Sequence, residues 1–385
     1  MPESTASQTP KPGRTALMLP GGGARGAYQV GVLKALAEIS ERDSPFPIIT
    51  GTSAGAINAA VLASHGTSLR TGVERLEYFW SRMRCHHIYR TDLRETVGKS
   101  ARWLGSLALG SLGIKSPRSL LDNEPLRQLL QRELRVDGVR DAIERGALHA
   151  LAITASGYSS ARAVSFFQGH SDIHQWQRPR RVGLRANIAP EHLLASAALP
   201  FIFPAAKIGH EFYGDGGMRH TAPLSTPIHL GASKLLIIGT RDEVPEPEPV
   251  DEDSQYPSIG EIGGYMLDII FMDNLQSDLT RLNRVNHTLS LMAEHERRHT
   301  HLQHMDTLLI KPSEDVRAIA DRHHHRVPGT VRFMLSRAGA WGPGMRLPSF
   351  LLFEGPFCRE LIELGYHDAQ QRRAEIEHLL AGDEG

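Results

Sequence analysis

The chain has 385 residues, 41% of them hydrophobic, with 43 basic and 43 acidic side chains. Because the net charge is zero, there is no general electrostatic attraction to nucleic acid, and we expect no nucleic-acid partner. Two cysteines, Cys85 and Cys358, are too few for a disulfide framework in a chain of this length, which is consistent with a reducing compartment.

The N-terminal segment and the hydrophobic pattern bear on location. Residues 1–13 are polar, include three prolines and lack the apolar stretch of a signal peptide, so they predict a disordered tail. No run of about eighteen apolar residues occurs, which excludes an ordinary membrane-spanning helix. We therefore expect a cytoplasmic protein whose contact with a membrane, if it makes one, is peripheral and at the inner membrane surface.

Short apolar runs alternate with helical patterns along much of the chain. The run Ala16–Leu19 precedes a helical pattern that ends at Ile39, and Phe46–Ile49 precedes one that ends at Ser64. Alternation of this kind predicts an α/β fold with a mostly parallel sheet between helices. Further apolar runs predict strands at 150–155, 163–167, 235–240 and 308–310.

The last third of the chain has a different composition. Residues 242–258 interleave acidic residues with prolines and predict a solvated loop, and residues 260–290 return to a helical pattern. Beyond Pro312 the pattern is helical. Because the length exceeds that of a usual single core, we expect one domain over residues 14–312 and a helical C-terminal extension over residues 313–385.

The segment Gly51-Thr52-Ser53-Ala54-Gly55 reads as a strand, a sharp turn carrying one serine, and a helix. The glycines at 51 and 55 allow a strained turn that presents Ser53 as a nucleophile at the head of the helix. The alternative is a turn of small residues whose serine merely caps the helix.

A second glycine motif follows the first apolar run and consists of Gly21, Gly22, Gly23, Arg25 and Gly26, with Ala24 between. Consecutive glycines let bare backbone approach a ligand, and N–H groups at a helix start favour an anion. The motif therefore predicts either donors for an oxyanion or a plain turn.

The same letters also satisfy GxGxxG, the pattern of a dinucleotide-binding loop. Such a site needs an acidic residue for the ribose, and the candidates Glu41 and Asp43 are poorly spaced. A nucleotide-binding regulatory protein thus remains an alternative, although this interpretation gives Ser53 no function.

The third motif is Asp215-Gly216-Gly217. A carboxylate next to glycines sits on adaptable backbone and could reach Ser53. The alternative is an ordinary hairpin turn, because Asp-Gly is among the commonest turn dipeptides.

Taken together, the three motifs and their order resemble the patatin-like phospholipase family. The glycine loop with its arginine comes first, GxSxG second, and Asp-Gly-Gly last, preceded by SAALPFIFP at 196–204. The resemblance covers about residues 14–240. It implies a three-layer α/β/α fold and the hydrolysis of carboxylic esters in lipids, with phospholipid or lysophospholipid as the favoured substrate class.

The resemblance also implies roles for individual residues. It makes Ser53 the nucleophile, Asp215 its general base, and the backbone N–H groups of Gly22 and Gly23, with Arg25 beside them, the oxyanion loop. No metal or organic cofactor is implied. A non-phospholipid esterase or a thioesterase with the same serine-aspartate dyad is the first alternative.

Histidines offer two rival sites. His220 lies near Asp215 in sequence and could complete a Ser-His-Asp triad. The segment 295–299 spells HExxH, which on a helix would place His295 and His299 on one zinc ion. Because histidine clusters recur in this chain, we expect the second site to be a solvated surface that binds no metal.

Lipid substrates require an interface, and two stretches are candidates for it. Residues 102–115 are apolar with a cation at each end, and residues 333–353 mix aromatic and aliphatic side chains with glycines, prolines and arginines. Burial in the core is the favoured interpretation of both, and membrane contact is the alternative.

Overall fold

The computed structural model describes residues 13–90, 119–242, 256, 258–268, 274–297, 299–300, 302–337, 339, 341 and 346–381. The segment 102–115 and most of the acidic loop at 242–258 lie outside these residues, so the expectations for them stay as stated. No helix among the described residues is long and apolar enough to cross a membrane.

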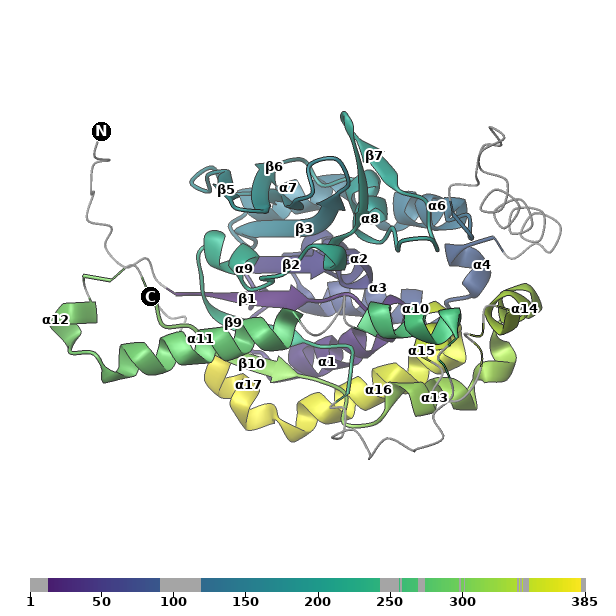
Figure 1. The fold of residues 1–385 in the computed structure, drawn as a ribbon. Helices are drawn as coiled ribbons and strands as arrows, with labels where there is room; N and C mark the ends of the chain where they lie inside the picture. Colours follow the sequence, from purple (N-terminus) through teal and green to yellow (C-terminus); the bar gives the residue numbers. More distant parts are fainter. Residues whose placement is uncertain are drawn as a thin grey trace.

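A single mixed sheet runs through the middle of the described part of the chain (Figure 1). Five neighbouring strands, in the order β10-β9-β1-β2-β3, are parallel, whereas β4 and β8 pair with β3 in the antiparallel sense. The mostly parallel sheet predicted from the alternating pattern is therefore confirmed. The strands are β1 (Arg14–Leu19), β2 (Ile48–Thr52), β3 (Ala150–Gly157), β4 (Ala163–Gly169), β5 (Trp176–Arg178), β6 (Arg181–Arg185), β7 (Ala206–Ile208), β8 (Glu211–Asp215), β9 (Ala232–Ile238) and β10 (Asp306–Ile310).

Helices cover both faces of the sheet. The helices of the N-terminal two thirds are η1 (Gly23–Gly26), α1 (Ala27–Ile39), α2 (Ala54–Ser64), α3 (Leu69–Ser81), α4 (Cys85–Ile88), α6 (Glu124–Glu133), α7 (Val136–Glu144), α8 (Pro190–Ser196), η3 (Gly216–Met218) and α9 (Ser225–His229). Those that follow are α10 (Ile259–Asp268), α11 (Asn274–Leu291), α12 (Glu294–Arg297), α13 (Val316–Arg322), η5 (His324–Arg326), α14 (Gly329–Arg337), α15 (Arg346–Leu351), α16 (Gly355–Gln371) and α17 (Arg373–Leu380).

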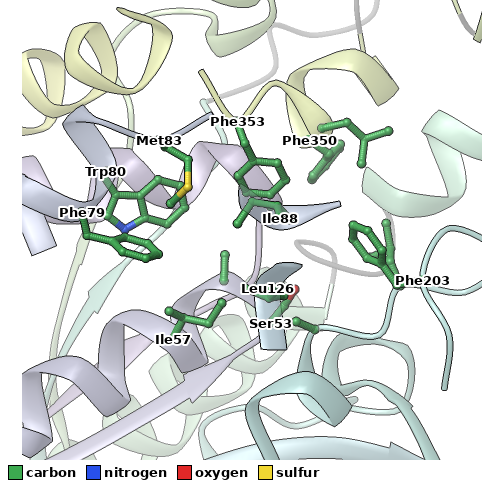
Figure 2. Close-up of a pocket in the computed structure, with 15 residues that line it drawn as sticks. Ser53, Ile57, Phe79, Trp80, Met83, Ile88, Leu126, Phe203, Phe350 and Phe353 are labelled. Atoms are coloured by element: carbon green, nitrogen blue, oxygen red, sulfur yellow. The ribbon is translucent and has the colours of Figure 1, made fainter. Parts of the chain in front are cut away.

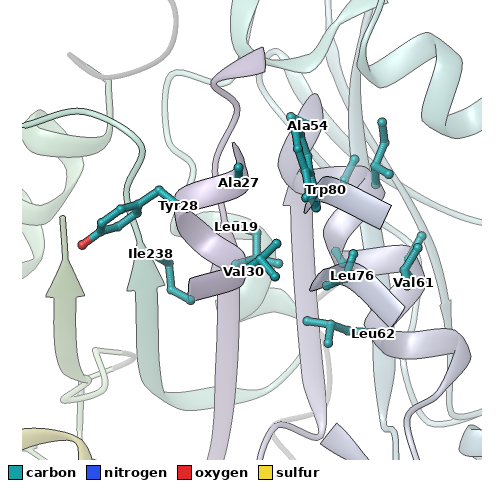
Figure 3. Close-up of a cluster of buried hydrophobic side chains, with 14 of the residues drawn as sticks. Leu19, Ala27, Tyr28, Val30, Ala54, Val61, Leu62, Leu76, Trp80 and Ile238 are labelled. Atoms are coloured by element: carbon teal, nitrogen blue, oxygen red, sulfur yellow. The ribbon is translucent and has the colours of Figure 1, made fainter. Parts of the chain in front are cut away.

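Strand β1 shows how the sequence builds two cores. Successive side chains of a strand point to opposite faces, so Leu17 and Leu19 enter one core while Ala16 and Met18 enter the other. The first core is shared with α1, α2, α3 and α16, and Figure 3 shows Leu19 within it. The second core is closed by α9, α11 and their flanking loops. The result is the expected three-layer α/β/α arrangement.

The helical C-terminal region packs closely on the N-terminal part of the fold. Helices α1 and α16 lie side by side (Figure 1), and glycines permit their contact. A Cβ atom at Gly31 would lie 1.9 Å from the carbonyl oxygen of Ile362, and one at Gly365 would lie 2.2 Å from that of Tyr28. The hydroxyl of Tyr28 also donates to Asp368 Oδ2 at 2.8 Å. Residues after Pro312 therefore help to form one layer of the fold.

Candidate active site

The turn between β2 and α2 is a strained strand-to-helix turn. Ser53 has φ 55° and ψ −126°, a conformation that a non-glycine residue rarely adopts. A Cβ atom at Gly51 would lie 2.5 Å from the Gly55 carbonyl oxygen, and one at Gly55 would lie 2.0 Å from that of Leu19. Both glycines are therefore needed for the turn. The Ser53 side chain makes no capping hydrogen bond to α2, which disfavours the capping interpretation.

Asp215 ends β8 and is completely buried. Its Oδ1 accepts the Gly217 N–H at 2.9 Å, and a side chain at Gly216 would collide with the Thr154 carbonyl oxygen. Burial raises the pKa of the Asp215 carboxyl to about 7, although hydrogen bonding with the Ser53 side chain and with the Gly217 N–H opposes the rise. The fold thus brings together two side chains that are about 160 residues apart in the sequence.

The second carboxylate oxygen of Asp215, Oδ2, is buried but receives no hydrogen bond of regular geometry from any described residue. An acceptor left in this way carries a desolvation cost, which a proton or a donor would relieve. The carboxylate is therefore prepared to take up a proton.

The C-terminal end of α8 holds both the serine turn and the aspartate. Ser196 Oγ accepts the backbone N–H of Ser53 at 2.9 Å and donates to the Thr154 carbonyl oxygen at 2.7 Å. Two residues further on, the carbonyl oxygen of Ala198 accepts the backbone N–H of Asp215 at 2.9 Å. In the sequence, Ser196 is only the first residue of the SAALPFIFP segment, and no local pattern indicates that it holds the turn.

The glycine loop lies between β1 and α1, against the chain's own backbone. Gly23 has φ +56°, and a Cβ atom there would lie 2.3 Å from the Phe350 carbonyl oxygen. A Cβ atom at Gly22 would lie 2.4 Å from Thr240 Oγ1, which itself donates to the Gly21 carbonyl oxygen at 2.7 Å. These close approaches are to protein atoms. The glycines are therefore explained by packing within the protein, which disfavours a dinucleotide-binding loop.

The same loop is adjacent to the serine turn. Gly26 packs on Ala54, because a Cβ atom added at Gly26 would lie 3.0 Å from the Ala54 methyl carbon. Gly23 lines the same pocket as Ser53. The backbone of the glycine loop therefore lies beside Ser53, as expected for an oxyanion loop.

Arg25 is 2% exposed and contacts α15. Its Nε and Nη2 donate to Ser349 Oγ at 3.0 Å and 2.6 Å, and its guanidinium lies 4.0 Å from the centre of the Phe350 ring. The charge is therefore used to attach the glycine loop to a C-terminal helix. Arg25 is therefore a buried side chain that joins the loop to α15, and not an exposed cation.

A narrow apolar pocket with a volume of about 40 Å³ opens at Ser53. Figure 2 shows aromatic and aliphatic side chains gathered around one space with Ser53 at its edge. The C-terminal region contributes Phe350, Leu351 and Phe353, which belong to the stretch 333–353 and confirm that part of it is buried. The complete lining is Gly23, Ser53, Ala54, Ile57, Phe79, Trp80, Met83, Ile88, Leu126, Ala197, Leu199, Phe203, Phe350, Leu351 and Phe353.

His220 makes no hydrogen bond to Ser53 or Asp215 in the described part of the chain. Its Nδ1 is 3.5 Å from Thr52 Oγ1, and its buried Nε2 has no hydrogen-bond partner among the described residues. Burial, with a smaller effect from Arg181, lowers the pKa of His220 to about 4, so the ring is neutral at physiological pH. The geometry favours a direct pairing of Ser53 with Asp215 over a triad.

The HExxH segment does not form the helical face that the motif requires. Helix α12 ends at Arg297, so His299 lies beyond it, and Glu296 Oε2 accepts the N–H of Ala293 at 3.0 Å. Within the described ranges, a different set of three metal-ligating side chains lies close together: His149, His170 and Asp172.

Comparison with known proteins adds a family match. Residues 17–228, more than half of the chain, match the family model described as patatin-like phospholipase. No curated protein matches the chain.

Several solved structures are similar to the chain at low identity. VipD from Legionella pneumophila is 12% identical with a TM-score of 0.33, and 95% of this chain aligns with 67% of that protein. The type III effector protein ExoU is 15% identical with a TM-score of 0.36, over 96% of this chain and 54% of the other. Human GIVD cytosolic phospholipase A2 is 14% identical with a TM-score of 0.43, over 97% and 59%. The chain thus spans about half to two thirds of the length of these proteins.

Proposed function

This chain belongs to the patatin-like phospholipase family of lipid hydrolases, and from that premise we propose that it cleaves carboxylic ester bonds of phospholipids or lysophospholipids through Ser53 and Asp215. The observation that carries the proposal is the pairing of a serine in a strained strand-to-helix turn with a buried aspartate whose pKa is raised to about 7. An aspartate with its usual pKa of roughly 3.9 is a weak base, and burial makes it a stronger one.

The proposed reaction begins with attack by Ser53 Oγ on the ester carbonyl carbon, while the Asp215 carboxylate takes the hydroxyl proton. Asp215 then returns this proton to the departing alcohol, and an acyl-serine remains. In the second half, Asp215 accepts a proton from water while the water oxygen attacks the acyl carbon. Asp215 then returns this proton to Ser53 Oγ as the bond between the acyl carbon and Oγ breaks, so the fatty acid leaves and Ser53 is regenerated. These steps require no metal or organic cofactor.

The negative charge that develops on the carbonyl oxygen needs donors next to Ser53. We assign this role to backbone N–H groups of the glycine loop at Gly22 and Gly23, of which Gly23 lines the pocket with Ser53. The N–H of Ser53 is already donated to Ser196, so it contributes to the shape of the turn and not to the oxyanion.

The lining of the pocket supports a lipid substrate. Its side chains are almost all aliphatic or aromatic and would surround an acyl chain. The volume of about 40 Å³ is smaller than the roughly 300–1,000 Å³ of ligand pockets. An acyl chain therefore requires side chains such as Phe203 and Phe353 to move apart. A cytoplasmic location with peripheral membrane contact remains part of this proposal.

A fluorophosphonate ester, which reacts with an activated serine, tests the proposal. The intact mass of the protein is measured after labelling, and the modified residue is found by peptide mapping. We expect one label on Ser53 in the wild type and none in Ser53→Ala. The exposed serine variant Ser290→Ala is the matched control and should label normally. Ester hydrolysis by purified Ser53→Ala would refute the serine mechanism.

A further inference from the structure

A group of two histidines and one aspartate lies where β3 begins and β4 ends. His149 immediately precedes β3, and His170 immediately follows β4. The antiparallel register places Ala150 opposite Gly169, so the two histidines are cross-strand neighbours. Their rings are stacked with centroids 5.6 Å apart and an angle of 25° between the ring planes. The backbone N–H of His170 donates to the His149 carbonyl oxygen at 2.8 Å.

Asp172 adds a carboxylate to the two imidazoles. Its Oδ1 lies 2.8 Å from His170 Nδ1 and 3.7 Å from His149 Nε2. One ligand atom from each of the three residues lies within 4.8 Å of the other two. Ligand atoms around a tetrahedral zinc ion, with bonds of about 2.1 Å, are about 3.4 Å apart. The observed separations lie on both sides of this value.

The backbone that carries these side chains is well fixed. The guanidinium of Arg185 donates to the carbonyl oxygens of Gly169 at 2.7 Å and His170 at 2.9 Å, and the N–H of His149 donates to the Pro47 carbonyl oxygen. The His149 side chain is 9% exposed, whereas His170 is 55% and Asp172 32% exposed. One ligand is thus anchored in the protein, and the other two face solvent and can adjust to an ion.

We propose that His149, His170 and Asp172 form a binding site for a divalent transition-metal ion of the Zn²⁺ class. The two imidazoles suit zinc better than calcium or magnesium, and zinc also accepts a carboxylate oxygen as a ligand. Three protein ligands leave a fourth position for water. The hydrogen bond between His170 and Asp172 would be replaced by bonds to the ion.

The site is distant from Ser53. Strands β2 and β3 are parallel with Ile48 opposite Ala150, so His149 lies at the N-terminal end of the strands and Ser53 follows their C-terminal end. His149 is level with Pro47 in this register, and six residue steps of about 3.3 Å lead from there to Ser53, so the two are separated by about 20 Å along the strand direction. The proposal is therefore independent of the ester hydrolysis assigned to Ser53, and the ion takes no part in that reaction.

Zinc binding to the full chain tests the inference. Protein freed of metal with a chelator is titrated with Zn²⁺ alone by calorimetry, and Co²⁺ is added in parallel because tetrahedral cobalt absorbs visible light. We expect the wild type to bind one ion saturably. His170→Ala and Asp172→Asn should each lower the affinity about tenfold or more, and both positions are exposed enough for the fold to be retained.

The chain contains 20 histidines, so weak binding elsewhere needs a control. The double variant His295→Ala with His299→Ala removes two exposed histidines from the HExxH segment and should bind Zn²⁺ as the wild type does. Absence of saturable binding in the wild type overturns the proposal. Equal affinities for the wild type and His170→Ala, or loss of binding only in the control, overturn it as well.

Discussion

Ser196 Oγ accepts the backbone N–H of Ser53 at 2.9 Å, so the turn that presents the proposed nucleophile is held by a side chain from α8. A non-glycine residue in such a conformation costs about 1–3 kcal/mol and persists only where its surroundings maintain it. Ser196 also donates to the Thr154 carbonyl oxygen, which connects the turn to the neighbouring strand β3.

The first prediction concerns this hydroxyl. Ser196→Ala removes the acceptor of the Ser53 N–H and one donor to the Thr154 carbonyl oxygen, so it should lower the free energy of unfolding by about 1–3 kcal/mol. It should also lower kcat for a soluble ester, because Ser53 loses its fixed position. Ser64→Ala is the matched control, since Ser64 is also buried and donates to the Val61 carbonyl oxygen within α2. Similar kcat values for the two variants would contradict a positioning role for Ser196.

The second prediction concerns the pH dependence of turnover. Only the ionised form of Asp215 can accept a proton, and its pKa is raised to about 7. We therefore expect kcat/KM for a soluble ester to rise about tenfold per pH unit in acid and to level off above about pH 7. Rates between pH 5 and pH 9 test this expectation. A profile that is already level at pH 5 would show that the carboxylate is not perturbed.

The third prediction concerns stability. The pKa of Asp215 is about 7 in the folded protein and roughly 3.9 in the unfolded chain, so the folded state holds the proton more tightly. This contribution to stability is complete below about pH 4 and is lost as the pH rises through about 7.

Asp215→Asn removes this titration. Between pH 5.5 and pH 8 the free energy of unfolding of the variant should therefore gain about 2 kcal/mol relative to the wild type, as measured by urea denaturation at both values. A difference that stays constant over this interval would mean that Asp215 does not titrate there.

The fourth prediction separates a dyad from a triad. Asp215→Asn should reduce kcat by about 10³-fold, within the usual range for the loss of a general base. His220→Asn should reduce it only a few-fold, because the His220 ring faces Thr52. Both rates are measured with the same soluble ester. Equal losses in the two variants would favour participation of His220.

The sequence predicts the local parts of the site well. A serine turn, a glycine loop and an Asp-Gly-Gly turn each consist of adjacent residues, and the glycines that make them possible can be recognised without knowing the fold. Their assembly follows from the parallel sheet, because the glycine loop and the serine turn follow neighbouring parallel strands at the same edge.

Contacts between distant segments could not be predicted in the same way. Arg25 and Ser349 are separated by 324 positions, and nothing near either residue indicates the other. The histidines show the same limit. HExxH is a recognisable pattern, yet its helix ends too early, whereas His149 and His170 become neighbours only through strand pairing.

The final prediction concerns the contact between Arg25 and α15. Because the guanidinium donates twice to Ser349 Oγ, Arg25→Ala should destabilise the protein and loosen the glycine loop. A double-mutant cycle with Ser349→Ala should give a coupling energy of about 0.5–3 kcal/mol in unfolding. If Arg25 acts by orienting the loop, turnover of a neutral soluble ester and of a phospholipid should fall by the same factor. A loss confined to the phospholipid would instead indicate that the arginine binds the lipid phosphate, which its burial against Phe350 argues against.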